Sequence, residues 1–176
     1  MPRPSVIYTI GHSTHAADTF LALLDAHEVR QLADIRTVPA SRRHPHFSKE
    51  RLSALLAEHG IRYQHLPGLG GLRKPRRDSV NTGWRHEGFR GYADYMQTPE
   101  FRPAVEKLEE FASVARTTVM CAEAVWWQCH RRLLSDALLV RGVSIWHILS
   151  TLPAKPHELS EFAREYEGGV IYPGLL

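Results

Sequence analysis

The feature that most constrains the fold is a regular alternation of short strand-like runs with segments of helical periodicity. A helical segment separates each strand-like run from the next. This order favours parallel strands whose sheet is covered by helices on both faces. The sequence therefore predicts an α/β fold with a mainly parallel sheet of about five strands. The runs predicted to be strands are 6–10, 32–36, 61–66, 117–120 and 143–149.

The helical segments carry apolar residues at intervals of three and four. Phe20, Leu23 and Leu24 have this spacing in the first helical segment. Gly60 and Gly142 follow two other helical segments, and helices commonly end at a glycine. A last helix is expected at 156–167, so the region 154–176 is predicted to be a helix followed by an apolar tail. The 176 residues fit a single domain.

The composition is that of a globular protein with a substantial core, because 43% of the residues are hydrophobic and 23% are charged. No window approaches the roughly 18 apolar residues that a transmembrane helix needs. The apolar run from Val6 to Ile10 is too short for a signal peptide. Two cysteines would be few for a secreted domain. We therefore expect a cytoplasmic protein without a membrane partner.

The positive charge of the chain is concentrated in one region. The formal net charge is +3, but residues 68–91 alone carry six basic and two acidic side chains. This basic segment, 68–91, is rich in glycine, proline and arginine and is predicted to be a long loop. Such loops commonly form lids or binding loops, although a solvated surface loop has the same composition. Local basicity favours a local anionic partner, with nucleic acid as one candidate.

Polar and charged residues gather after the predicted strands, where parallel strands bring their carboxyl ends to one edge of the sheet. Ligands of open α/β sheets bind at that edge. We therefore predict one cleft there, formed by segments far apart in the sequence. The candidate residues are His12, Ser13, Asp34, Arg36, Arg42, Arg43, Gly70, Gly71, Cys121, Glu123, Cys129, His130 and Arg131.

Four short motifs resemble the family called domain of unknown function 488. They are TIGHS at 9–13, LADIR with TVP and SRR at 32–43, LGG at 69–71, and MCAE with CHR at 120–131. The motifs are collinear and span nearly the whole chain. The resemblance implies a cytoplasmic α/β protein in which these motifs hold the functional residues, and it implies no particular activity.

The stretch MCAEAVWWQCHRR, at 120–132, allows three kinds of site. A zinc site normally uses two closely spaced pairs of ligands, and Cys121 and Cys129 are the only cysteines, so we predict neither a metal nor another cofactor. A thiol catalyst is a second interpretation, because Cys129 lies near a helix start where the dipole and Arg131 would lower its pKa. A buried cysteine without such chemistry fits the same pattern.

The interpretation favoured by the residue types is an anion site. His130 and Arg131 lie at the predicted helix start, where main-chain N–H groups and a guanidinium bind phosphate or carboxylate. Asp34 and Glu123 then become candidates for general acid and base, with His130 beside them. The competing interpretation is a structural charge network, in which Asp34 or Glu123, the latter as a buried carboxylate, simply neutralises Arg36 or Arg131.

Two functions follow from these patterns. The first is an enzyme, such as a hydrolase, lyase or transferase, that acts on a phosphate-bearing nucleotide or nucleic acid by general acid/base chemistry. The second is a non-catalytic nucleic-acid-binding module that uses the basic segment. The carboxylates Asp34 and Glu123 favour the enzyme, because a simple phosphate binder gains nothing from acids among its arginines.

Overall fold

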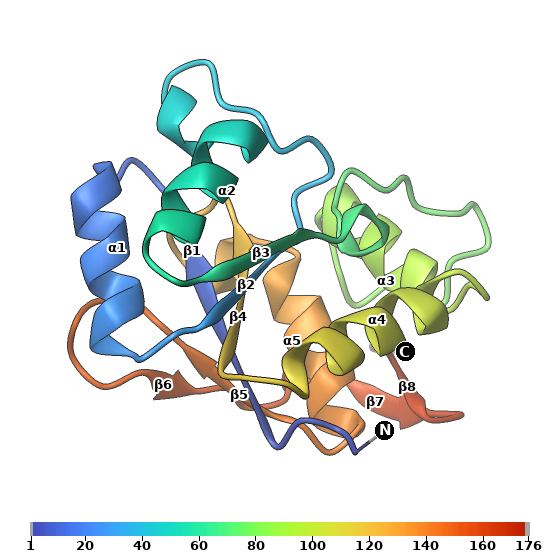
Figure 1. Ribbon diagram of the computed structural model, residues 1–176. Coiled ribbons are helices and arrows are strands. Elements are labelled where there is room, and N and C mark those ends of the chain that lie inside the picture. Colours follow the sequence, from blue (N-terminus) through green and yellow to red (C-terminus); the bar gives the residue numbers. More distant parts are fainter. Residues whose placement is uncertain (1, 175–176) are drawn as a thin grey trace.

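The computed structural model describes residues 2–174, which form a single α/β domain around a six-stranded sheet (Figure 1). The order of the strands across the sheet is β3-β2-β4-β1-β5-β6. The first five strands are parallel, and short β6 pairs antiparallel with β5. The predicted fold class is therefore confirmed. The strands are β1 (Val6–Gly11), β2 (Gln31–Asp34), β3 (Arg62–His65), β4 (Thr117–Cys121), β5 (Ser144–His147) and β6 (Lys155–Pro156).

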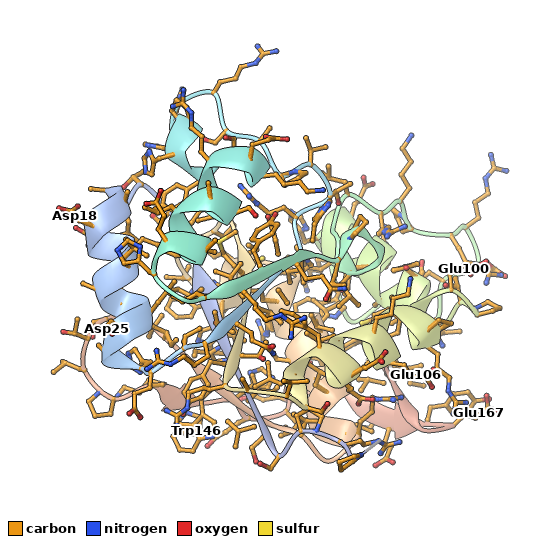
Figure 2. All side chains as sticks on the ribbon, viewed as in Figure 1. Asp18, Asp25, Glu100, Glu106, Trp146 and Glu167 are labelled. Atoms are coloured by element: carbon orange, nitrogen blue, oxygen red, sulfur yellow. The ribbon has the colours of Figure 1, made fainter. Side chains whose placement is uncertain are left out.

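Five α-helices cover the two faces of the sheet (Figure 1). One face packs against α1 and α2, whose Phe20, Leu24 and Leu52 belong to one apolar cluster. The opposite face packs against the other three helices in a second cluster. Acids on the outer sides, such as Asp18 and Glu106, point away from the sheet (Figure 2). The helices are α1 (Ala17–Ala26), α2 (Lys49–Glu58), α3 (Glu87–Met96), α4 (Phe101–Ala112) and α5 (Arg131–Val140).

The strand order places a topological switch point between β1 and β4. From β1 the chain runs outward through β2 to β3, and then it returns so that β4 pairs with both β2 and β1. The helix after β1 lies on one face, and the helix after β4 lies on the other. The two connections therefore diverge at the carboxyl ends of these strands, which is where open α/β sheets bind ligands.

The helix predicted at 156–167 is wrong. Residues 155–171 instead contain β6, an irregular segment, and a hairpin of β7 (Arg164–Tyr166) and β8 (Gly169–Ile171). Glu167 and Gly168 take positive φ angles of 49° and 77° in the hairpin turn, and a helix does not contain such angles. The hairpin and tail bury Val170 and Tyr172 in the same cluster as α5. This burial outweighs the local helical pattern.

The basic segment is partly helical and is held against the domain by hydrogen bonds. Its last residues form the start of α3, and the buried carboxylate of Asp94 in that helix holds the irregular part. Asp94 accepts hydrogen bonds from the main-chain N–H of Arg76 at 2.8 Å, the hydroxyl of Ser79 at 2.5 Å and the amide of Asn81 at 2.8 Å. Lys74 and Arg77 remain exposed. The segment is therefore an ordered surface that presents positive charge.

Candidate functional site

Asp34, at the end of β2, is wholly buried and saturated with hydrogen bonds. The guanidinium of Arg36 donates two parallel bonds to its carboxylate, at 2.9 and 2.7 Å, and the main-chain N–H of Arg36 donates a third at 3.1 Å. The hydroxyl of Tyr63 donates to the same carboxylate, and burial together with this bond raises the pKa of Tyr63. The carboxylate therefore fixes Arg36 in place and has little capacity left for proton transfer.

His12 follows β1 and is held as a neutral imidazole. Its Nδ1 donates to the main-chain carbonyl of Ser13 at 2.9 Å, so its Nε2 is an acceptor and faces Nη1 of Arg36 at 3.4 Å. Burial lowers the pKa of His12 to about 4, and the nearby charge of Arg36 acts in the same direction. The ring stacks on Phe47 with 4.3 Å between centroids. His12 and Arg36 are therefore brought together, as the sequence predicts.

The segment after β4 lies directly on the end of β1. The main-chain N–H groups of His12 and Ser13 donate to the carbonyls of Cys121 and Ala122 at 2.9 and 3.0 Å. A Cβ atom at Gly11 would lie only 1.6 Å from the main-chain oxygen of Glu123. Glycine is therefore required at position 11 for this close approach of two main chains.

Glu123 is not the buried carboxylate that the sequence suggested. Its side chain is exposed, and no ion pair joins it to Arg131 or Arg36 within residues 2–174. Its main-chain carbonyl instead accepts a 2.9 Å hydrogen bond from Nη2 of Arg131. The competing interpretation of Glu123 as a buried carboxylate paired with an arginine is therefore wrong, because the segment turns its main chain, and not its side chain, toward the interior.

The two cysteines meet at the carboxyl end of β4. Both are buried, and their sulfur atoms lie 2.7 Å apart. Burial raises the pKa of the Cys121 thiol well above its ordinary value, and its hydrogen bond to Cys129 adds to this. Burial alone would also raise the pKa of Cys129. The pKa of the Cys129 thiol is nevertheless held well below its ordinary value, because hydrogen bonds from Cys121 and His130 and the positive charge of Arg131 stabilise the thiolate.

Arg131, the first residue of α5, is buried with 1% of its surface exposed. Nη2 donates to the carbonyl of Glu123, Nη1 lies 3.4 Å from Oγ1 of Thr9, and the main-chain N–H lies 3.5 Å from Sγ of Cys129. Among residues 2–174 its Nε has no hydrogen-bond partner and no carboxylate forms an ion pair with it. Arg131 is therefore a buried positive charge without a contacting carboxylate.

A chain of buried hydrogen bonds connects Arg131 to the carboxylate of Asp136. Asp136 accepts from Nε2 of His157 at 2.7 Å, and Nδ1 of His157 then accepts from Nε2 of His147 at 2.9 Å. Nδ1 of His147 accepts from the hydroxyl of Thr9 at 2.6 Å, and that hydroxyl oxygen faces Arg131. Every donor in this relay points from the guanidinium toward the carboxylate, an arrangement that strengthens each bond.

The relay is enclosed by neighbouring aromatic side chains. Trp126 stacks on His147 with 4.4 Å between ring centroids and 6° between planes, whereas neighbouring Trp127 is exposed. Burial lowers the pKa of His147 to about 2, and the charge of Arg131 acts in the same direction. Tyr172 donates a second side-chain hydrogen bond to Asp136 at 2.7 Å. The relay residues were missed from the sequence, although a histidine and an aspartate on apolar faces were an available signal.

Gly71, which follows Gly70, lies between Thr37 and the ring of His130. Thr37 donates a 2.9 Å hydrogen bond to the carbonyl of Gly71, and a Cβ at Gly71 would lie 3.0 Å from Nδ1 of His130. Nδ1 of His130 also lies 3.5 Å from Sγ of Cys129, and its Nε2 is buried without a partner within residues 2–174. Contacts therefore run in a closed ring from His12 through the cysteines, His130, Gly71 and the 36–37 main chain.

Other predicted site residues lie outside this ring. Arg42 and Arg43 are exposed on the loop before the short helix η1 (Pro45–Phe47). Ser13, with a φ of 48°, contributes main-chain groups to the ring rather than its hydroxyl. A separate cavity of about 730 Å³ lies beside β3 and α4 and mixes acids such as Glu100 with bases such as Lys107. The ring, and not this cavity, holds the chemically unusual side chains.

The free energy of unfolding is expected to fall as the pH drops below about 6.5. His12 and His147 regain an ordinary pKa of about 6.5 when the chain unfolds, but in the folded protein the values are about 4 and about 2. Between these values the unfolded state binds more protons, so acid favours unfolding. Each histidine contributes at most about 1.4 kcal/mol per pH unit. Urea unfolding midpoints at pH 7 and pH 5 measure the slope.

The variant His12→Gln removes one of the two titrating groups and should reduce the difference between the two midpoints. His59→Gln is the matched control, because His59 is exposed at the end of α2 and its replacement should leave the difference unchanged. Equal midpoints at both pH values for the parent protein would contradict this account of the buried imidazoles.

Two further findings concern metal ions and membranes. Within residues 2–174, no group of three or more histidine, cysteine or acidic side chains is placed to hold a metal ion. Among the same residues, no helix has the length and apolar character needed to cross a membrane.

Comparison with known proteins agrees with the resemblance seen in the motifs. A family model described as Domain of unknown function DUF488 matches residues 16–138, which is more than half of the chain. The match includes Asp34, Arg36, both cysteines and Arg131. No curated protein and no solved structure matches the chain. The family model and the collinear motifs together show that this chain belongs to the DUF488 family.

Proposed function

We propose that the protein is an enzyme that acts on an anionic, phosphate-bearing substrate at the carboxyl ends of β1 and β4. The observation that carries the proposal is the buried guanidinium of Arg131, which has an unpartnered Nε and no carboxylate ion pair within residues 2–174. A guanidinium stays charged at any physiological pH, and a buried charge needs a compensating one. A phosphate group of a nucleotide or nucleic acid supplies that charge.

Cys129 is the group best suited to react. Its thiolate is favoured by the main-chain N–H and charge of Arg131 and by His130. A thiolate is a strong nucleophile, and a position next to cationic groups is where reactive cysteines occur. Cys129 is therefore the proposed nucleophile. Its thiolate also balances part of the buried positive charge of Arg131 until the substrate binds.

Proton transfer is assigned to His130 in preference to Asp34. His130 lies within 3.5 Å of the sulfur and has a buried Nε2 without a partner within residues 2–174. An imidazole with one uncommitted nitrogen can pass a proton to a leaving group. Asp34 acts instead as a positioning residue, because its oxygens are engaged by Arg36 and Tyr63. Exposed Glu123 stays a candidate acid at the edge of the site.

The test is a turnover screen with nucleotides, phosphomonoesters and oligonucleotides as substrates. Cys129→Ser should lower turnover at least about 10³-fold, and His130→Gln should lower it about 10²-fold. The control is Arg102→Gln, on the exposed side of α4, which should keep parental turnover. Turnover that persists unchanged in Cys129→Ser would refute the assignment of this thiol.

The screen also separates the second candidate, a non-catalytic nucleic-acid-binding module. The observation in its favour is the ordered basic segment with exposed Lys74 and Arg77. Such a module would bind oligonucleotides with an affinity that falls steeply with salt concentration. It would release no product, and loss of Cys129 would leave its binding unchanged. That combination of results would favour the module over the enzyme.

A further inference from the structure

Cys121 and Cys129 are brought together by the main fold and not by a flexible loop. Cys121 is the last residue of β4 and pairs in register with Gly11 of β1. Cys129 directly precedes His130, the N-terminal cap of α5, and is separated from Cys121 by seven residues. The two sulfur atoms are in direct contact at 2.7 Å, and both cysteines are free thiols. The pair is therefore positioned in advance for a reaction between its members.

We propose that Cys121 and Cys129 form a redox couple that exchanges with low-molecular-weight disulfides. This activity goes beyond the turnover proposed above. It shares the Cys129 thiolate but needs no phosphate-bearing substrate. It assigns a separate role to Cys121, which contacts the other sulfur and lies beside the carbonyl of Glu123.

The surroundings of the two sulfurs differ in the way that such a couple requires. Cys129 faces the cationic side of the site, with His130 and the charge of Arg131 beside it. Cys121, at the end of β4, has the Cys129 sulfur and the carbonyl of Glu123 as its neighbouring polar groups, and neither group is cationic. Cys129 is therefore the sulfur that attacks first, and Cys121 is the sulfur that resolves the intermediate.

The reaction balances in two exchanges with a small disulfide, RSSR. In the first, the Cys129 thiolate attacks one sulfur of RSSR, the S–S bond breaks, and one RS⁻ leaves and takes a proton from water. In the second, Cys121 gives its proton to water and its sulfur attacks the Cys129 sulfur of the mixed disulfide, which expels the second RS⁻. The products are one intramolecular disulfide and two RSH. Two electrons pass from the protein thiols to RSSR.

The segment that joins the cysteines limits the size of the oxidant. Within residues 122–128, the carbonyl of Glu123 lies 3.8 Å from the Cys121 sulfur, and Ala122, Ala124 and Trp127 are among the exposed residues of that segment. Both cysteines are buried, so only a small oxidant can be expected to reach the sulfurs. A small disulfide such as oxidised glutathione is the appropriate probe, and a protein disulfide is too large to reach them without opening the segment.

The experiment treats the folded parent protein, Cys121→Ser and Cys129→Ser with oxidised glutathione, without any phosphate-bearing substrate. Samples are quenched with acid and alkylated, and their intact masses are measured over time. The parent should lose two hydrogen atoms and carry no glutathione. Cys121→Ser should accumulate the mixed disulfide at Cys129. Cys129→Ser should react at least about tenfold more slowly, because less of the Cys121 thiol is ionised.

Two results would overturn the proposal. One is a folded parent protein that keeps both thiols while the same protein in urea is fully oxidised, since the fold would then prevent the exchange. The other is equal rates of mixed-disulfide formation in the two serine variants, since the sulfurs would then have no division of roles. Neither result depends on the turnover screen. A failure of the redox couple is therefore distinguishable from a failure of the proposed enzyme.

Discussion

The variant Asp136→Asn is expected to lower the melting temperature by roughly 10 °C, through a loss of about 3–5 kcal/mol of stability. Asp136 is wholly buried and accepts hydrogen bonds from His157, the main-chain N–H of Ser160 and Tyr172. It is also the negative end of the relay that begins at Arg131. Asparagine keeps the shape, but it removes the charge and places an amide donor where only acceptors fit.

Thermal melts and urea unfolding of the parent and the variant measure this loss. The matched control is Asp78→Asn, because Asp78 is exposed and its ion pair with Arg76 is a surface contact worth at most about 1 kcal/mol. A second variant, Tyr172→Phe, removes one bond to Asp136 and keeps the charge, so it should cost less than Asp136→Asn. If Asp136→Asn melts within two or three degrees of the parent, the relay contributes no stabilising charge to Arg131.

A second large effect is expected for Gly11→Ala. The added Cβ would lie 1.6 Å from the main-chain oxygen of Glu123 and 2.5 Å from its carbonyl carbon. The clash is with main-chain atoms, which cannot move aside by changing a rotamer as the end of a flexible side chain can. The whole segment after β4 must therefore move. That movement breaks the bonds from the N–H groups of His12 and Ser13 and the bond from Arg131 to Glu123. We expect a loss of at least about 3 kcal/mol.

Urea unfolding measures the stability of Gly11→Ala, and the rate of alkylation by iodoacetamide measures how far the segment has moved. The Cys121 sulfur contacts the carbonyl of Glu123 in that segment and both cysteines are buried, so the folded variant should be alkylated faster than the parent. Gly169→Ala is the control, because its nearest neighbour, the carbonyl of Tyr166, would be at an ordinary 3.6 Å. An unfolding midpoint and an alkylation rate equal to those of the parent would show that the segment does not rest on Gly11.

These two variants test different parts of one idea, which is that the charge of Arg131 is shared. Its guanidinium faces a main-chain carbonyl and a threonine hydroxyl, and that hydroxyl leads through two histidines to Asp136. The main-chain N–H of Arg131 lies 3.5 Å from the Cys129 sulfur. A directly bonded carboxylate would neutralise the group. The relay instead stabilises Arg131 from a distance, which leaves its positive charge to act on the Cys129 sulfur and, in the proposed enzyme, on the anionic substrate.

The sequence by itself determined the class of the fold, and it indicated that the candidate site residues lie at the carboxyl-end edge of the sheet. Short apolar runs located the five strands, because strands of a parallel sheet are buried on both faces, and the spacing of apolar residues located the main helices. The direction of the crossovers then required the strand ends to meet. This reasoning placed His12, Arg36, Cys129 and Arg131 together, and the structure joins them through the ring of contacts.

Only the tertiary structure decided how those residues are paired. The helix expected at 156–167 became strands, because Val170 and Tyr172 gain more by packing beside α5 than the segment gains from helical propensity. Glu123 turned outward, since a main-chain approach to Gly11 fixes the segment that carries it. The relay from Asp136 to Arg131 depends on four segments distant in sequence. Local patterns hold no information on such side-chain pairing, which arises only when packing brings donors and acceptors within about 3 Å.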